Sequence, residues 1–551
     1  MSEAARGTRG AVVAPHHLAT AAGLAILQRG GHAVDAAIAT NAVLAVVVPG
    51  GCGIGGDAFW LVWDASEARE YGLNGSGRSP AAADPARLRA GGLSRLPARG
   101  PLTITVPGAV RSWADAHARW GRLSRAEVLR PAIELARDGF AATVGFVASV
   151  ERTAPFVRLE LGRAAAFFGV FRPHGRPWIE GEVVRLPALA ATLERLAVEG
   201  FDAFYDGELG ERQAAALAAG GAPFAAADFR EHRSTWTEPI STTYRGVRVT
   251  THPPNSSGIV ALEILNILEA FEAPRRSAFG PAGAMDAGWI HRGIEAAKLA
   301  MADRDAQLTD PEWREIPVDW LLDKRRAGTL AAGIDPERAS TPTPVTNPPG
   351  GGTVYLAVVD AAGNAVSLIE SNWTGFGSGV VDEETGIHYQ NRGAFFSLHP
   401  DHPNVLAPRK RTLHTLVPGM LFRDAANGPA AAPWIVTGSM GGDAQPQIHA
   451  QVVSSLVDGA ADLETAIGAP RWFVAPRELL TPPVDVQAEP RFAAGVLEAL
   501  EAFGHPVIRT APFDRALGHA HAIELVDGGP AAGGSVVAVT DPRSEGLPAA
   551  W

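Results

Sequence analysis

The spacing of apolar residues predicts helices near the start of the chain. Small and apolar residues fill positions 18–28, and two glycines follow at 30 and 31. They also fill positions 33–47, and Pro49 stands just beyond. Because glycine and proline end helices, both segments are predicted to be helical. Ser124 stands three residues before Glu127 and opens an apolar-periodic stretch to about residue 137, so this capping-box pattern predicts a further helix.

Further along the chain, strand patterns join the helical ones. Apolar residues recur at helical spacing within residues 283–305, which predicts a long helix with one buried face. Residues 58–63 are rich in Phe, Trp, Leu and Val and are predicted to form a buried strand. Residues 353–359 and 365–369 predict a hairpin, because the turn at 360–364 contains Asp, Gly and Asn, which tolerate left-handed backbone.

The composition is that of a globular protein. The 551 residues include 48 Lys and Arg against 59 Asp and Glu, for a net charge of −11, and 46% are hydrophobic. The 61 glycines and 42 prolines stay below the share typical of disorder. The chain exceeds the roughly 250–300 residues at which one core stops growing, so we expect two domains or one large elaborated domain. The acidic balance argues against a nucleic-acid partner, since the basic run at 409–411 is short.

No pattern in the sequence indicates a disulfide, a signal peptide or a membrane span. Cys52 is the only cysteine, which excludes an intrachain disulfide. The apolar stretch near the N-terminus is broken at Pro15, and the longest apolar run, at 42–49, is shorter than the ~18 residues of a spanning helix. We therefore expect a cytoplasmic protein with no membrane partner.

The common cofactor and nucleophile motifs are missing. Residues 51–56 match G-x-G-x-x-G, but a predicted helix precedes them and a predicted strand follows, the reverse of a dinucleotide site. The sixteen histidines are scattered, without H-E-x-x-H or paired Cys/His spacing, and G-x-S-x-G is absent. We expect no metal and no other cofactor.

Thr353 is a candidate nucleophile because of its position. It begins a predicted strand directly after residues 340–352, a segment rich in Pro and Gly that is predicted to be an exposed loop. A cut before Thr353 would place a hydroxyl and a free α-amine on one residue, and the amine could act as base. Such amines titrate near pH 7.7–8.0. A threonine that only begins a strand is the alternative interpretation.

Ordered motifs over nearly the whole chain resemble the γ-glutamyltranspeptidase family of N-terminal-nucleophile hydrolases. The first part of the chain contains GGHAVDAA at 30–37, GIGG at 53–56, VPG at 106–108, NSSG at 255–258, and Ala296, Lys298 and ADR at 302–304. The second part contains TVYLAVVD at 353–360, GNAV at 363–366, FGSG at 376–379, PRKR at 408–411 and MGG at 440–442.

The resemblance implies the fold and the maturation of the chain. The fold would be α+β, a four-layer αββα sandwich forming one large elaborated domain. The chain would be made as an inactive precursor and cut between Gly352 and Thr353. The large chain would then be residues 1–352 and the small chain residues 353–551, and the two would remain packed together. Two such pairs could form a homodimer.

The resemblance also implies the catalytic residues. Thr353 would be the nucleophile both in self-cleavage and in catalysis, where attack on an amide gives an acyl-enzyme that water or an amine resolves. Gly441 and Gly442 match the glycine pair whose backbone N–H groups form the family's oxyanion hole.

The resemblance implies substrate-binding residues as well. Arg78 matches the family's arginine that binds the substrate's carboxylate, and a planar guanidinium suits this bidentate contact. An exposed loop arginine is the other interpretation. Asn372 matches a substrate-binding asparagine, and His414 and Thr415 stand where transpeptidases carry two serines.

One position departs from the pattern of γ-glutamyl enzymes. Phe395 occupies the place of an aspartate that neutralises the substrate's α-ammonium, and a phenyl ring cannot pair with a buried ammonium. Unless another carboxylate such as Asp443 substitutes, the pattern favours an amide whose acyl part has a carboxylate but no amine. Oxamate amidohydrolases and glutaryl-type cephalosporin acylases are family branches with that profile.

The leading hypothesis is thus a self-processing amidohydrolase acting on a small carboxylate-bearing amide. One alternative is a true γ-glutamyltransferase that acts on glutathione. An alternative of another class is an unprocessed, non-catalytic binding protein of the same fold.

Overall fold

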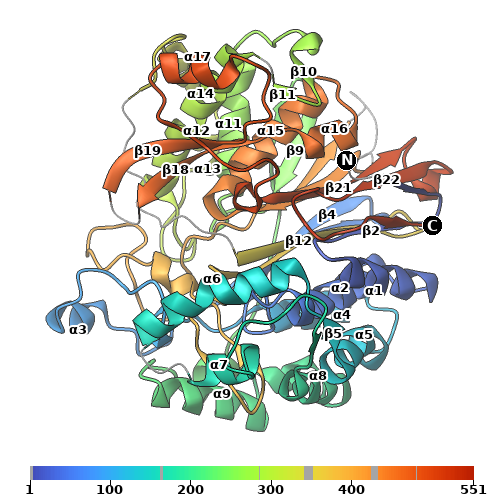
Figure 1. Cartoon of the computed structure of the whole chain (residues 1–551), viewed down its shortest axis with the longest axis vertical. Helices are drawn as coiled ribbons and strands as arrows, with labels where there is room; N and C mark the ends of the chain where they lie inside the picture. The colour runs from blue at the N-terminus through green and yellow to red at the C-terminus, as the bar shows by residue number, and fades with distance from the viewer. Residues whose placement is uncertain (1–3, 162–164, 285, 341–351, 424–431, 479–480) are drawn as a thin grey trace.

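Two seven-stranded sheets lie face to face at the centre of the molecule (Figure 1). The computed structural model describes residues 4–161, 165–284, 286–340, 352–423, 432–478 and 481–551. The first sheet has the order β23 (Ala549–Ala550), β2 (Ala11–Val13), β12 (Gly352–Val359), β13 (Ala365–Trp373), β3 (Asp57–Asp64), β4 (Arg69–Gly75) and β7 (Thr235–Thr237). The second has the order β1 (Ala5–Gly7), β22 (Ser535–Val539), β21 (His519–Val526), β17 (Ile435–Met440), β16 (Pro418–Phe422), β9 (Val247–Thr251) and β8 (Ile240–Tyr244).

Helices cover the outer face of each sheet. The first sheet packs against α1 (His17–Gln28), α2 (Ala33–Val47) and α4 (Ala109–Trp120), with α5 (Arg125–Asp138) and α8 (Pro187–Glu199) outside them. The second sheet packs against α11 (Gly258–Glu269), α15 (Gln445–Val457) and α16 (Leu463–Gly468), and α12 (Ala287–Gln307) packs on α11. The predicted four-layer αββα sandwich in one large domain is therefore confirmed.

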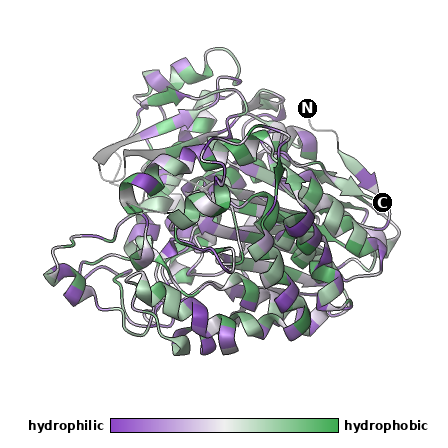
Figure 2. Cartoon of the chain, turned by 60° about the horizontal axis from the view of Figure 1, so that its bottom comes forward, coloured by the Kyte–Doolittle hydropathy of each residue, from purple (hydrophilic) through white to green (hydrophobic). Residues whose placement is uncertain are grey.

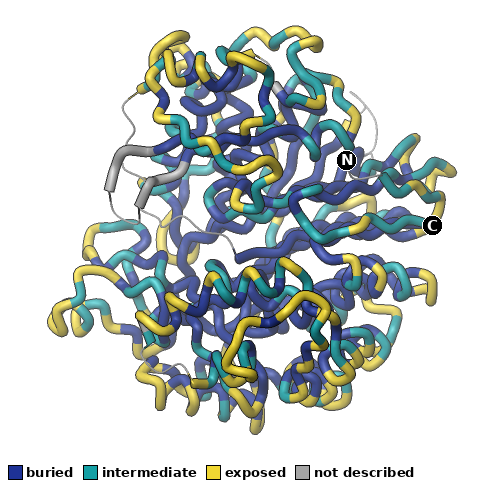
Figure 3. Tube along the Cα trace, viewed as in Figure 1, coloured by how far each residue is buried: buried dark blue, intermediate teal, exposed yellow. Residues whose placement is uncertain are grey.

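Both faces of the central strands are buried. Along β12, Tyr355 and Ala357 contribute to the core between the two sheets, while Leu356 and Val358 pack on the helical side. This explains why the strand is a continuous apolar run rather than an alternating one. The central strands are dark blue in Figure 3, and the exposed segments lie at the periphery. The outer helices carry both apolar and polar residues along their length, as Figure 2 shows.

Most of the predicted elements are confirmed. The helix predicted at 33–47 has those bounds, and α5 begins with the capping box of Ser124 and Glu127. The predicted hairpin is formed by β12 and β13. The long helix was predicted to begin at 283 but begins at Ala287, because Gly283 and Ala284 form a short strand, β11. Residues 341–351 of the predicted loop lie outside the described residues.

Strands from the two predicted chains alternate within the first sheet. β12, which begins at Gly352, and β13 lie between β2 and β3, which precede residue 352. No helix among the described residues combines the length and the hydropathy needed to cross a bilayer.

Candidate active site

Thr353 lies at the start of β12, opposite Ser371 of β13, and is only 4% exposed. The Thr353 hydroxyl donates a hydrogen bond to Ser371 Oγ at 3.0 Å. Ser371 Oγ in turn donates to the carbonyl oxygen of Gly352 at 2.8 Å. The serine hydroxyl therefore connects the candidate nucleophile with the carbonyl of the Gly352–Thr353 peptide bond, where cleavage is predicted.

A β-bulge shapes this end of the hairpin. Gly352 pairs with Trp373 and Thr353 with Ser371, so Asn372 is the extra residue between them. Trp373 has a positive φ of 78°, an uncommon conformation for a bulky residue, and its N–H donates to Ser371 Oγ at 2.7 Å. Bulges re-aim side chains and are frequent beside active sites. Here the bulge places Ser371 and Trp373 beside Thr353.

The charged side chain of Arg392 contacts this network. Its Nη2 donates to Ser371 Oγ at 3.2 Å, and its Nη1 donates to Thr415 Oγ1 at 3.0 Å. The side chain is 1% exposed, and the guanidinium carbon lies 4.7 Å from the ring centroid of Trp373 and 5.2 Å from that of Phe395. Burial lowers the pKa of Arg392 to about 9, opposed by the charges of Asp57 and Asp443. At neutral pH the guanidinium stays charged.

Thr415 and His414 lie behind this network, fully buried. His414 Nε2 is 3.3 Å from Asp57 Oδ2, and Asp57 Oδ1 accepts from the N–H groups of Gly77 and Gly108. Burial raises the pKa of Asp57 to about 7, opposed chiefly by Arg392, and burial lowers the pKa of His414 well below its usual value. The structure thus connects Thr415 to Thr353 through Arg392 and Ser371, while His414 contacts Asp57.

Gly441 and Gly442 follow β17. Their φ values are +147° and +58°, conformations that glycine adopts without steric cost. The 3₁₀ turn Gly442–Ala444 then leads into α15. Gly441 and Thr353 line the same cavity.

This cavity has a volume of about 540 Å³ and lies between residues of both predicted chains. Besides Thr353 and Gly441, its walls include Trp373 and Asp443. On the other side it is bordered by α6 (Val144–Leu161), from which Ser149, Arg152, Thr153 and Phe156 line it. Phe156 is 51% exposed, so the cavity reaches the surface beside α6. It is large enough for a substrate with a sizeable leaving group.

None of the four predicted substrate-binding residues is among those that line the cavity, and neither are Ser371 and Arg392. Arg78 Nη2 contacts Glu312 Oε1 at 2.6 Å, a carboxylate that it shares with Arg411. Asn372 is buried, with its Nδ2 2.8 Å from His388 Nε2. Its Oδ1 has no hydrogen-bond partner among the described residues. Of the predicted binding residues, Thr415 is the one that the structure connects to Thr353 by hydrogen bonds.

Phe395 and Asp443 have different environments. Phe395 is 6% exposed and its ring packs against Trp373, so it offers no charge to a ligand. Asp443 lines the cavity, and its Oδ1 accepts a 2.6 Å hydrogen bond from Arg304, whereas its Oδ2 is buried without a partner among the described residues. Burial raises the pKa of Asp443.

Ser371 and Arg392 were not among the residues predicted from the sequence. Ser371 could have been found from the predicted hairpin, because pairing residue 359 with 365 places residue 371 opposite 353. Arg392 gave no such signal, because arginine is mostly exposed and its neighbours come from separate parts of the chain.

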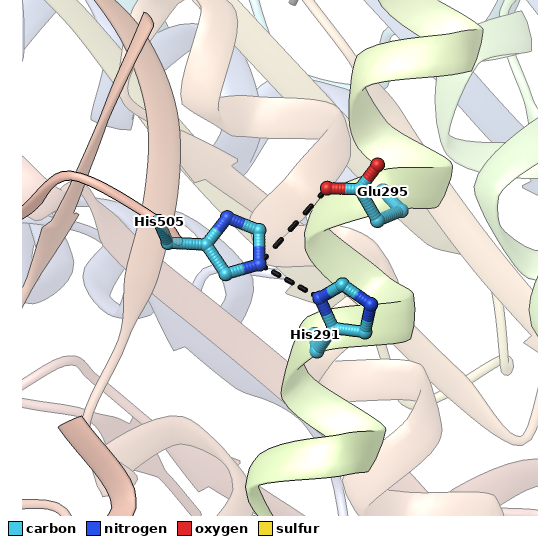
Figure 4. Close-up of side chains that lie close together, drawn as sticks. All are labelled: His291, Glu295 and His505. Atoms are coloured by element: carbon cyan, nitrogen blue, oxygen red, sulfur yellow. Dashed lines mark hydrogen bonds and ion pairs between the residues drawn. The ribbon is translucent and has the colours of Figure 1, made fainter. Parts of the chain in front are cut away.

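A second cluster of ionisable residues lies outside the cavity and contains His291 and Glu295 of α12 together with His505 (Figure 4). His291 Nδ1 is 2.8 Å from His505 Nε2, and His291 Nε2 is 2.7 Å from the carbonyl oxygen of Asp335. These residue types can bind zinc. However, the ammonium of Lys298 contacts Glu295 Oε1 at 2.6 Å and already supplies a cation there. The cluster therefore fits a hydrogen-bonded contact between the two predicted chains better than a metal centre.

Known proteins match the chain over nearly its full length. The profile of the family described as Gamma-glutamyltranspeptidase matches residues 19–551. The chain is 38% identical over 548 residues to the Glutathione hydrolase-like YwrD proenzyme of Bacillus subtilis (strain 168), covering 99% of both. It is also 38% identical over 560 residues to the Oxamate amidohydrolase proenzyme of Klebsiella pneumoniae, again covering 99% of both. The crystal structure of cephalosporin acylase from Bacillus halodurans matches with a TM-score of 0.89 and 38% identity, covering 100% of this chain and 97% of that one.

Proposed function

The chain belongs to the γ-glutamyltranspeptidase family, and we propose that it is a self-processing amidohydrolase that cleaves a small carboxylate-bearing amide through an acyl-enzyme on Thr353. The first step is cleavage of the Gly352–Thr353 bond. The Thr353 hydroxyl attacks the carbonyl carbon of Gly352, and the acyl group moves from nitrogen to oxygen as the hydroxyl proton passes to the released nitrogen, which becomes the α-amine of Thr353. Water then hydrolyses the resulting ester to the Gly352 carboxylate and the Thr353 hydroxyl. This gives a large chain of residues 1–352 and a small chain of residues 353–551.

The hydrogen bonds of Ser371 support this first step. A serine hydroxyl has one proton, and Ser371 directs it to the Gly352 oxygen while accepting from Thr353. Negative charge that develops on the Gly352 oxygen during attack would be stabilised by this donor. The contact of Arg392 with Ser371 Oγ makes the serine proton a stronger donor.

Processing creates the catalytic group. The α-amine of Thr353, once free, accepts the proton of the Thr353 hydroxyl as it attacks the substrate amide, and then passes a proton to the leaving amine. The N–H groups of Gly441 and Gly442 hold the oxyanion of the tetrahedral intermediate. Water then hydrolyses the ester, releases the acid and regenerates Thr353.

The two chains would remain associated after cleavage. The small chain supplies β12 and β13 to a sheet whose adjoining strands, β2 and β3, belong to the large chain. Separating the chains would break both of these strand pairings and expose the apolar faces of β12. Burial of this apolar surface favours the associated state.

The observation that carries the proposal is the bridge from Thr353 through Ser371 to the Gly352 carbonyl. Its test is denaturing electrophoresis of the purified protein over time, with mass spectrometry of the fragments. We expect two chains, with the small one beginning at Thr353. Thr353→Ala should remain uncut, whereas Thr353→Ser should still be cut. A wild-type chain that stays whole, with no hydrolytic activity, would instead support a non-catalytic binding protein.

The substrate assignment rests on Phe395, which leaves no carboxylate at that position to pair with an ammonium. In the proposal, Arg78, Asn372, His414 and Thr415 remain candidates for binding the substrate, although Arg78 shares Glu312 with Arg411. The 540 Å³ cavity would hold the leaving amine. Ammonia release from oxamate and nitroaniline release from a glutaryl p-nitroanilide should both be measurable.

A second candidate function is glutathione hydrolysis, which Asp443 favours. Its Oδ2 atom is buried, has no partner among the described residues and belongs to a residue that lines the cavity, so it could pair with an α-ammonium. The comparison is between γ-glutamyl p-nitroanilide and glutaryl p-nitroanilide, which differ only in that amine. Turnover that depends on the amine and is lost in Asp443→Asn would favour the second function.

A further inference from the structure

Arg392 differs from the other arginines that are buried to the same degree. Arg304, Arg471 and Arg543 are each at most 2% exposed, and each forms an ion pair with at least one carboxylate. Among the described residues, no carboxylate forms an ion pair with Arg392; Asp57 and Asp443 act on it only at longer range. A buried charge without a counter-ion is costly unless a partner is supplied. The missing partner can be a ligand.

The guanidinium also retains hydrogen-bonding capacity. Its terminal nitrogens contact Ser371 and Thr415, whereas Nε is buried without a partner. The rings of Trp373 and Phe395 lie against it, and although Arg392 is not itself among the residues that line the cavity, Trp373 is. A planar guanidinium with free N–H groups at its edge suits a planar carboxylate.

The sign of the charge at this place is the reverse of what an α-amino substrate needs. The resemblance to γ-glutamyl enzymes implies an ammonium-binding aspartate at the position of residue 395, and here that residue is phenylalanine. The Arg392 guanidinium lies 5.2 Å from its ring. A cation at this point repels an ammonium and attracts a carboxylate.

Two hydrogen bonds in series limit the length of the acyl group. Ser371 Oγ is 3.0 Å from Thr353 Oγ1 and 3.2 Å from Arg392 Nη2. An attacking oxygen lies about 3–3.5 Å from its carbonyl carbon, and a charged N–H···O bond is about 2.7–2.9 Å long. The distance from Thr353 Oγ1 to Arg392 Nη2 cannot exceed the sum of the two contacts through Ser371 Oγ, so a short acyl group can reach from one to the other, whereas a glutaryl chain would have to fold back on itself.

We propose that Arg392 is the specificity-determining residue that binds the substrate's acyl carboxylate, and that this carboxylate is separated from the scissile carbonyl by no more than one methylene group. The inference rests on the proposed function, and it selects oxalyl-type and malonyl-type amides over glutaryl-type ones. In the uncut chain, the Gly352 carbonyl is the acyl group beside Thr353, and Ser371 already connects that carbonyl to Arg392. Cleavage frees the Ser371 proton for the substrate.

The test is hydrolysis of a series of p-nitroanilides by the processed enzyme. The acyl groups are oxalyl, malonyl, succinyl and glutaryl, with acetyl as the neutral control. We expect kcat/KM to be highest for oxalyl or malonyl. Arg392→Gln should lower kcat/KM for that substrate by about 10²-fold, with acetyl changed far less, and Arg392→Lys should recover part of the loss. Exposed Arg69→Gln serves as the matched control and should change nothing.

Three results would overturn the proposal: glutaryl as the best substrate, equal losses for charged and neutral substrates in Arg392→Gln, or a charge-selective loss in Arg78→Gln instead. If Arg392→Gln is not processed, wild type and Arg392→Lys are compared by calorimetric titration with oxalate, malonate, succinate and glutarate. Tighter binding of oxalate and malonate than of succinate and glutarate, weakened in Arg392→Lys, would support the role of Arg392 in binding the carboxylate. Equal binding of all four would refute that role. Oxalate binding without any anilide hydrolysis would refute the proposed function but not the role of Arg392 in binding a carboxylate.

Discussion

Replacing Ser371 by alanine tests whether its hydroxyl activates the Gly352–Thr353 bond. The change removes a single oxygen atom, so the backbone of β13 and its ladder with β12 should persist. It deletes the donor to the Gly352 carbonyl at 2.8 Å and the acceptor of the Thr353 hydroxyl at 3.0 Å. It also removes an acceptor from the Trp373 N–H and from Arg392.

The size of the effect follows from these contacts. Loss of one hydrogen-bond donor to a developing oxyanion typically slows a reaction by about 10²–10³-fold, or about 2.7–4 kcal/mol of barrier. We therefore expect Ser371→Ala to slow processing by about that factor. Each buried polar group that is left without a partner costs about 1–3 kcal/mol of stability. The Trp373 N–H cannot reorient as the Thr353 hydroxyl can, so it should account for most of the destabilisation.

The assay follows the uncut band of freshly purified precursor by electrophoresis and fits a first-order rate. Ser371→Thr keeps the hydroxyl and is the matched control, with a rate close to that of wild type. Stability is compared by urea unfolding in the uncut Thr353→Ala background, where processing cannot intervene. Processing of Ser371→Ala within about threefold of wild type, in a folded protein, would refute the role assigned to this hydroxyl.

Two further predictions concern ionisation and metals. Burial raises the pKa of Asp57 to about 7, so the folded state favours the protonated acid. The free energy of unfolding that this preference contributes is fully present below the unfolded pKa of about 3.9 and is lost as the pH rises toward 7. Asp57→Asn mimics the protonated acid, and its Tm relative to wild type should therefore be higher at pH 8 than at pH 5; the same difference at both pH values would contradict the ionisation of Asp57. A metal chelator should leave the Tm and the hydrolysis rate unchanged, and added zinc should not raise the Tm, because Lys298 already contacts Glu295 in the cluster with His291 and His505. A zinc-dependent rise in Tm that disappears in His505→Ala would show that the cluster binds metal.

The sequence predicts local structure here better than it predicts the site. The helix at 33–47 and the capping box of Ser124 depend on neighbouring residues, and both have the predicted bounds or contacts. The hairpin of β12 and β13 is also local, because its turn residues and apolar runs are adjacent in the chain. The strand order β2, β12, β13, β3 joins residues hundreds of positions apart, and only the family resemblance anticipated the sandwich.

The substrate side of the site depends on details that a motif cannot show. From the family resemblance Asn372 was predicted to bind the substrate, yet the bulge at this position sets Ser371 and Trp373 beside Thr353 instead. A one-residue irregularity changes which side chains face a site, and it leaves no mark in the residue types. Arg392 could not be identified from the sequence for a similar reason. A buried arginine without a counter-ion is recognised only once its neighbours in space are known.

The alternation of strands from both predicted chains has a consequence for refolding. Before cleavage, β2, β12, β13 and β3 belong to one polypeptide, so the first sheet forms in a unimolecular reaction. After cleavage the same sheet needs an encounter between two molecules, neither of which holds a complete core. Cutting one peptide bond would thus turn refolding from a first-order into a second-order process, and a processed enzyme that unfolds in dilute solution would recover slowly or not at all. The folded state of the mature enzyme would then depend on the history of the chain as well as on its sequence.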